Sequence, residues 1–156
     1  MLKINECCVE IDFEFSYLNN KFMQVQVING NQVVDVNPTL INNKYLSIAK
    51  IDVVLPTNVS LHFKGKNANF DTIMDDQGNI TDNLYVKILA IKLDGFGIPE
   101  DFLHQGLKLY TTDNQTFVTS FIGFNGTMML DLIKPAVFSQ FLYFKNYFNH
   151  GLNDRH

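Results

Sequence analysis

Apolar and polar residues alternate along most of this chain, and the alternation predicts strands. The pattern is strictest over residues 7–17, where every second residue from Val9 to Tyr17 is apolar and the residues between them are polar. Successive strand side chains point to opposite faces, so this segment predicts a strand with one buried and one wet face. The same reasoning predicts further strands over residues 22–28, 32–36, 45–55, 59–64, 84–93, 107–111, 117–124 and 127–133.

Two Asn-Gly dipeptides lie between predicted strands. Asn29-Gly30 follows residues 22–28, and Asn125-Gly126 follows residues 117–124. Asn-Gly is favoured in two-residue hairpins because both central residues of that turn take a positive φ. The sequence therefore predicts a hairpin at each dipeptide. Residues 84–93 are apolar on both faces, which is typical of a central strand.

Short strands separated by turn signals at intervals of about 8 to 12 residues are typical of a two-sheet sandwich. The sequence therefore predicts an all-β fold, a two-sheet β-sandwich of jelly-roll type, in preference to a closed barrel. No linker divides the chain, so we expect residues 1–156 to form a single domain. Pro99 and Gly106 bracket one predicted short helix, residues 99–105, because proline favours the first turn and glycine ends a helix.

The last part of the chain changes its spacing. Val137, Phe141, Phe144 and Phe148 recur at i, i+4, i+7 and i+11, which favours a helix over residues 135–148, although a strand is an alternative. One helix face can bury only about half of the aromatic residues there. The remainder either dock on a neighbouring subunit or close one end of the sandwich, and the sequence favours neither. The candidate interface residues in this aromatic C-terminal segment, residues 135–156, are Phe138, Phe141, Tyr143, Phe144, Tyr147 and Phe148.

Composition supports the β assignment and narrows the class of protein. The chain has 18 Asn and 14 Phe against 4 Ala and 4 Glu, so strand and turn formers outnumber helix formers. Its net charge is −4 and Arg155 is the one arginine, which argues against a nucleic-acid partner. No segment reaches the about 20 apolar residues of a membrane span, so we expect no membrane insertion.

The N-terminal residues carry no apolar run after Lys3, so the sequence predicts no signal peptide. Cys7 and Cys8 are adjacent and would point to opposite faces of a strand, which argues against a disulfide between them. We therefore expect the chain to be made in a reducing cytoplasm.

Acidic residues gather in two places, and the first is the segment over residues 71–82. Calcium takes six to eight oxygen ligands, and it is the one candidate cofactor for this segment. The segment does not fit the EF-hand pattern. With Gly78 at the sixth position of that pattern, the loop would begin at Ile73, which has no side-chain oxygen to bind calcium. Turn chemistry is the alternative explanation of the segment. The candidate ligands are Asp71, Asp75, Asp76, Asn79 and Asp82.

The second group is a row on the first predicted strand, Glu10, Asp12 and Glu14. Alternate strand residues lie about 6.8 Å apart on one face, so three like charges in a row repel one another. The row is either the contact for a cation or a basic partner, or an ordinary solvated strand face.

Catalytic motifs are missing from the sequence. It contains no Gly-x-Ser-x-Gly, P-loop or His-Glu-x-x-His pattern. Paired carboxylates for sugar hydrolysis are not evident either, since Glu6, Glu10 and Glu14 are three of the four glutamates and lie together near the N-terminus. We therefore expect that the protein is not an enzyme. A glycan-acting hydrolase is kept as the third hypothesis, after the two that are given below.

Loop aromatics beside amides favour a sugar site, because aromatic rings stack on sugars and amides bond hydroxyl groups. Tyr45, Phe70 and Phe96 have Asn or Asp neighbours, although the chain has no Trp. The segment 86–95, VKILAIKLDG, resembles carbohydrate-binding modules of the xylan-binding type. In that group such a strand leads to a calcium-assisted binding loop. The resemblance implies that Asp94 and the acidic loop would take part in binding.

The composition also resembles that of small virion proteins of phages that infect low-GC hosts, being rich in Asn, Ile and Lys and nearly free of Arg. Such proteins decorate capsids or build tails and fibres, and often bind cell-surface glycans. Our first hypothesis is therefore a non-enzymatic structural protein of a viral particle whose partners are other protein subunits. The alternative is a stand-alone carbohydrate-binding module.

Overall fold

The computed structural model describes residues 6–67, 69–98, 109–111 and 121–132, and the fold is all-β. The first sheet has six strands. In spatial order they are β10 (Phe96–Gly97), β9 (Val86–Leu93), β1 (Glu6–Phe15), β5 (Lys44–Val54) and β4 (Thr39–Ile41), and β12 (Phe121–Ile122) also pairs with β9. All of its pairings are antiparallel, as the sequence pattern predicts for strands with one wet face.

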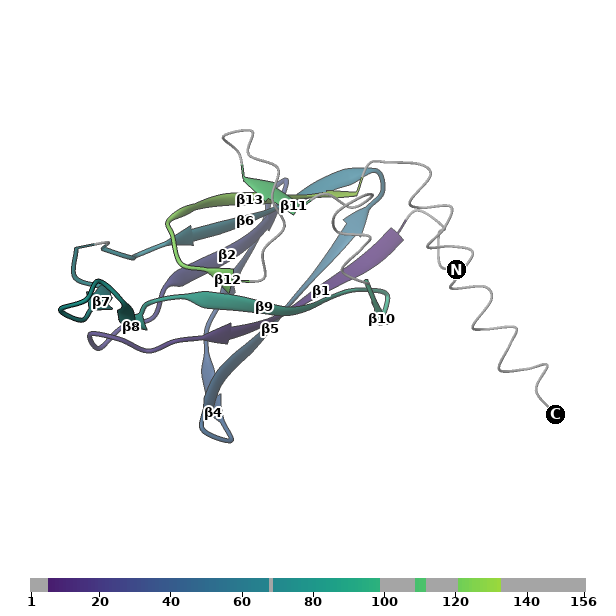
Figure 1. The fold of residues 1–156 in the computed structure, drawn as a ribbon. Helices are drawn as coiled ribbons and strands as arrows, with labels where there is room; N and C mark the ends of the chain where they lie inside the picture. The colour runs from purple at the N-terminus through teal and green to yellow at the C-terminus, as the bar shows by residue number, and fades with distance from the viewer. Residues whose placement is uncertain (1–5, 68, 99–108, 112–120, 133–156) are drawn as a thin grey trace.

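The second sheet has five strands and packs against the first as the other layer of a sandwich (Figure 1). In spatial order they are β11 (Leu109–Thr111), β13 (Gly126–Leu132), β6 (Thr57–Lys64), β2 (Gln24–Asn29) and β3 (Gln32–Val36). A separate two-stranded sheet consists of β7 (Thr72–Met74) and β8 (Ile80–Asn83). The predicted β-sandwich is therefore confirmed.

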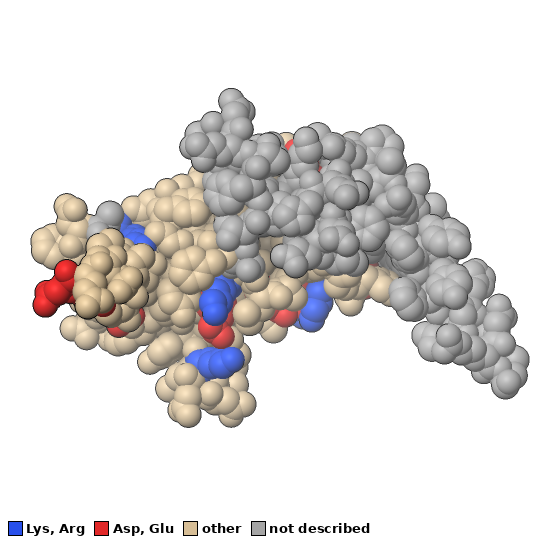
Figure 2. All heavy atoms as spheres, in the orientation of Figure 1, with Lys and Arg blue, Asp and Glu red and all other residues tan. Residues whose placement is uncertain are grey.

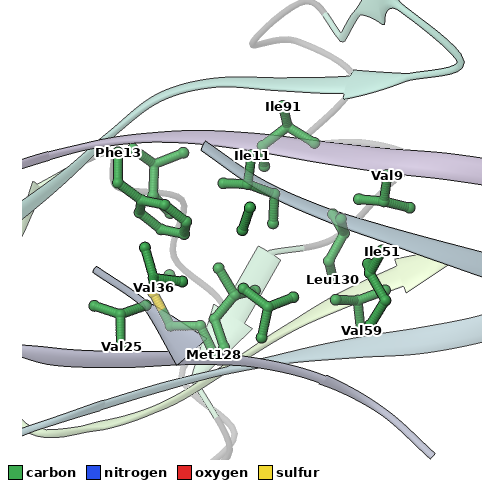
Figure 3. Close-up of a cluster of buried hydrophobic side chains, with 14 of the residues drawn as sticks. Val9, Ile11, Phe13, Val25, Val36, Ile51, Val59, Ile91, Met128 and Leu130 are labelled. Atoms are coloured by element: carbon green, nitrogen blue, oxygen red, sulfur yellow. The ribbon is translucent and has the colours of Figure 1, made fainter. Parts of the chain in front are cut away.

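The core lies between the inner faces of the two large sheets, and Figure 3 shows side chains from both sheets pointing toward one another. Val9, Ile11 and Phe13 of β1 are fully buried, and Val59 and Leu61 of β6 are buried opposite them. The residues between them on β1 are half-buried on the outer face. The predicted alternation is confirmed for both strands, and Cys7 and Cys8 lie on opposite faces of β1.

Strand β9 departs from simple alternation. Asp12 of β1 lies opposite Ala90, but the next residue, Phe13, lies opposite Ile88, so Leu89 is an extra residue in β9. Such a bulge turns the side chains on either side of it. Ile88 is buried in the core, whereas Leu89 lies on the outer face and is 53% exposed. The predicted strand is confirmed, and the bulge explains why it looked apolar on both faces.

The predicted hairpin at Asn29-Gly30 is confirmed, but its turn lies one residue further along. Asn29 still pairs with Gln32, so Gly30 and Asn31 are the central residues, and Gly30 has a φ of 58°. Glycine at the first central position is the requirement of a type II′ turn. Two Asn-Asn pairs instead supply consecutive positive φ angles: Asn19 and Asn20 at 54° and 61°, and Asn42 and Asn43 at 51° and 65°.

The predicted hairpin at Asn125-Gly126 is wrong. Strand β12 before it pairs with β9 in the first sheet, and β13 after it pairs with β6 in the second, so the chain crosses between layers. The side-chain amide of Asn125 explains the crossing. Its Oδ1 accepts from the backbone N–H of Lys66 at 3.0 Å, and its Nδ2 donates to the carbonyl of Lys66 at 2.7 Å. The amide thus takes the place of a strand partner.

Two predicted elements lie outside the described residues. They are the short helix over residues 99–105 and the C-terminal helix over residues 135–148. The same holds for the predicted interface residues, Phe138, Phe141, Tyr143, Phe144, Tyr147 and Phe148.

We expect Phe13→Ala to lower the free energy of unfolding by about 3 to 5 kcal/mol, because it leaves a cavity between the two sheets. The matched control is Phe70→Ala, the same change at a ring that is 70% exposed, which should shift stability by less than about 0.5 kcal/mol. Urea unfolding followed by circular dichroism measures both. Equal losses for the two variants would contradict the assignment of the core.

Candidate functional site: an acidic hairpin

The hairpin formed by β7 and β8 protrudes from one end of the sandwich (Figure 1). Ile73 pairs with Asp82 and Met74 with Ile80, with a bulge between the two pairs. Phe70, Ile73, Met74 and Ile80 are 42% to 70% exposed. We call residues 70–83 the acidic hairpin. A two-stranded hairpin has little stability of its own in water, so this one depends on its attachment to the sandwich.

The hairpin carries charge of one sign. Asp75, Asp76 and Asp82 are exposed, and residues 67–86 contain no Lys, Arg or His. In Figure 2, acidic atoms lie at the end of the molecule that holds β7 and β8. Exposed carboxylates and exposed apolar side chains therefore lie together on this hairpin, with Met74 and Ile80 paired directly across its two strands.

An ion pair between a buried carboxylate and a partly exposed lysine fixes one side of the hairpin base. The Asp71 carboxylate is 1% exposed and lies 2.6 Å from the ammonium of Lys21. It also accepts from the backbone N–H of Asn67 at 2.6 Å and from Nδ2 of Asn19 at 2.9 Å. The hydrogen bond from Lys21, with those from Asn67 and Asn19, outweighs burial and lowers the pKa of Asp71 to about 2.

A second polar cluster fixes the other side of the base. The Lys66 ammonium donates to Oδ1 of Asn83 at 2.5 Å and to the carbonyl of Gly123 at 2.6 Å, and the Thr72 hydroxyl donates to the same Oδ1 at 2.9 Å. A Cβ at Gly123 would lie 3.2 Å from Nδ2 of Asn83, so a larger residue there would require the Asn83 side chain to shift by a few tenths of an ångström. Burial lowers the pKa of Lys66.

The predicted calcium ligands have other tasks. Asp71 is held by Lys21, as described, and Asp75 closes the turn between the strands. Oδ1 of Asp75 accepts from the backbone N–H groups of Gln77 and Asn79 at 2.9 Å each, and these bonds lower its pKa. Asp76 and Asp82 are exposed. In the described part of the chain, no three His, Cys, Asp or Glu side chains lie close enough to hold a metal ion. The calcium site stays a prediction, and the contacts of Asp71 and Asp75 do not favour it.

The carboxylate row on β1 is met by lysines of the two flanking strands. Lys50 and Lys92 lie 3.6 and 3.3 Å from the carboxylate of Glu10, and Lys92 also lies 3.6 Å from Asp12. Lys44 lies 3.7 Å from Glu14. The hydrogen bond to Glu10 raises the pKa of Lys92. The sequence hypothesis of an outside cation for this row missed these lysines, because only the pairing of β1 with β5 and β9 brings them close to the carboxylates.

The four predicted sugar-binding residues do not form one surface. Tyr45 packs in an aromatic cluster, with its ring centroid 4.8 Å from that of Phe22. Phe70 is on the acidic hairpin, and Phe96 is half-buried on β10. Asp94 shapes the turn before β10: it has a φ of 50°, and its Oδ1 accepts from the backbone N–H of Cys8 at 2.8 Å. Figure 1 shows β4, β7 and β10 at three separate ends of the molecule.

Comparisons of the chain with family models, with curated proteins and with solved structures found no match. The described segments include no helix with the length and hydrophobicity of a membrane span.

We expect Asp71→Asn to lower the free energy of unfolding at neutral pH by about 2 kcal/mol, since the depressed pKa of Asp71 is itself a stabilisation. The ordinary pKa of 3.8 falls to about 2 in the folded state, so this contribution is complete above about pH 4 and is lost as the pH falls through 2. The stability gap between wild type and variant should therefore narrow between these pH values. Chemical unfolding at a series of pH values measures the gap.

The matched control for this experiment is Asp76→Asn on the same hairpin, where the carboxylate is exposed. It should leave stability unchanged at every pH. A gap for Asp71→Asn that stays constant from pH 7 to pH 2 would contradict the ion-pair explanation.

Proposed function

We propose that this chain is a non-enzymatic structural protein of a phage particle, a decoration, tail or fibre component, that works through contacts with other protein subunits. The observation that carries the proposal is the acidic hairpin, with Phe70, Met74 and Ile80 each more than half exposed. Monomeric proteins rarely gather large apolar side chains on a protruding element unless a partner covers them.

The hairpin has the composition of an interface. Interface centres are enriched in aromatic residues and methionine, and their rims are polar. Phe70 and Met74 fit such a centre, and Asp75, Asp76 and Asp82 fit the rim. Held on both sides of its base, the hairpin would lose little conformational entropy on docking, and preorganisation of this kind favours binding.

The assignment to a viral particle has support of a different kind. It rests on the resemblance in composition, an Asn-rich chain with a single arginine, together with the β-sandwich fold. The jelly-roll topology, the synthesis in a reducing cytoplasm and the assembly into a virion belong to the same proposal. So does the aromatic C-terminal segment, residues 135–156, as a further interface element.

A stand-alone carbohydrate-binding module is the second candidate. Its supporting observation is Phe70, a ring that is 70% exposed and lies close to the amide of Asn19, whose Nδ2 donates to the Phe70 carbonyl at 2.9 Å. A glycan array with and without calcium distinguishes the candidates. Binding that Phe70→Ala abolishes would favour the module over the structural protein.

The experiment on the first candidate is made on particles purified from the source that encodes this sequence. We expect mass spectrometry to find the chain in the particles at constant stoichiometry. The double variant Met74→Asp/Ile80→Asp should be incorporated at least ten-fold less, because charges would replace the apolar centre of the contact. A chain absent from purified particles would refute the virion assignment.

The control is Leu40→Asp, which places the same charge at an exposed apolar residue of β4. It should be incorporated like wild type, and circular dichroism should show all variants folded. Normal incorporation of the hairpin variant would refute the role of the hairpin while leaving the virion assignment in place.

A further inference from the structure

The outer face of the six-stranded sheet carries a second exposed apolar area. Ile48 of β5 and Leu89 of β9 are 60% and 53% exposed, and both lie beside Asp12 of β1. Leu46 and Ala90 are half-buried on the same face. Four lysines surround these residues, and together we call the area the lysine-rimmed face. Its lysines are Lys44, Lys50, Lys87 and Lys92.

The lysines of this face lie further out than the carboxylates with which they pair, and Asp52 of β5 is also exposed there. The side chains of Lys44 and Lys50 are 67% and 66% exposed, whereas their partners Glu14 and Glu10 are 17% and 20% exposed. Glu10 and Glu14 therefore lie beneath the ammonium groups with which they pair. In Figure 2, basic atoms lie over the sheet that contains β5 and β9, with acidic atoms between them.

We infer that the acidic hairpin of one copy of this chain docks on the lysine-rimmed face of a second copy. The two surfaces differ in the charge that lies furthest out: the hairpin displays three exposed carboxylates and no basic side chain, whereas the lysines of the face are more exposed than the carboxylates with which they pair. Both surfaces also carry exposed apolar side chains. The inference rests on the proposed function, which makes the hairpin a contact site, and names the partner of that site. It also gives a use to Leu89, which the bulge in β9 turns away from the core.

Such a contact is head-to-tail, because the hairpin and the face are different parts of one chain (Figure 1). A two-fold symmetric dimer would use the same patch on both subunits. Each docked copy here leaves its own hairpin or its own face unoccupied, so association continues until a ring closes or a filament grows. This geometry suits a repeating component of a particle.

The test is a mixing experiment with two variants that each disable one surface. Met74→Asp/Ile80→Asp disables the hairpin and keeps the face, and Ile48→Asp/Leu89→Asp disables the face and keeps the hairpin. All four residues are exposed, so the variants should fold. Size-exclusion chromatography with light scattering should show wild type as assemblies larger than a dimer and each variant alone as a monomer. The mixture should give a one-to-one dimer and nothing larger, because one intact hairpin meets one intact face.

Val33→Asp is the matched control, since Val33 is exposed on β3 of the other sheet. It should assemble like wild type. Assembly of the face variant alone would overturn the inference, because it would mean that hairpins pair with hairpins. Wild type that stays monomeric at every concentration would also overturn it. The proposed function would then still stand if the particles contain the chain, with a different subunit as the partner.

Salt provides a second measurement that needs no disruptive variant. Raising the ionic strength from about 0.01 M to about 1 M shortens the Debye length from about 30 Å to about 3 Å, so wild-type association should weaken. Asp76→Asn/Asp82→Asn should associate more weakly at low salt, by about ten-fold, and should respond less to salt. Association that salt leaves unchanged would contradict the role of the charges.

Discussion

Strand β1 is paired on both sides, with β5 over its full length and with β9 from Val9 to Phe15. A strand held on both edges cannot rotate, so alternate side chains are committed to opposite faces. One face contributes Ile11 and Phe13 to the core. The other holds the carboxylate row, and the same pairing brings Lys50 and Lys92 to it. The core and the lysine-rimmed face are therefore two results of one register.

The acidic hairpin inverts the usual distribution of side chains. Its base buries charged and polar groups, Asp71 against Lys21 and the Lys66 ammonium against Asn83, while Phe70 and Met74 face solvent. The residue after β1 holds the segment that follows the hairpin, since the backbone N–H of Tyr85 donates to the hydroxyl of Ser16 at 2.7 Å. Burying charge is costly unless partners surround it. The base of the hairpin therefore contains charged groups whose burial costs free energy, although the hairpin itself adds little to the core.

Local pattern was sufficient for the fold class, because alternation in β1 and β6 depends on neighbouring residues alone. It was not sufficient where distant segments meet. Asn125-Gly126 has the signature of a hairpin, yet the backbone of Lys66 is the partner of its amide. Asp71 looked like a calcium ligand because Lys21, its partner, lies 50 positions earlier in the sequence. The hairpin was identified as a candidate site from the exposure of its apolar side chains, and the acidic composition of the loop does not reveal that exposure.

The bulge in β9 shifts the alternation of inner and outer residues by one position. Lys87 and Lys92 are five positions apart, so strict alternation would place one of them in the core. The extra residue, Leu89, restores both to the surface while Val86 and Leu93 stay buried. With Leu89 removed, the two lysines would be four positions apart, and strict alternation would place both on the outer face without a bulge. The bulge therefore changes neither the core side chains nor the lysines of β9, and its one effect is to add the exposed Leu89 to the outer face.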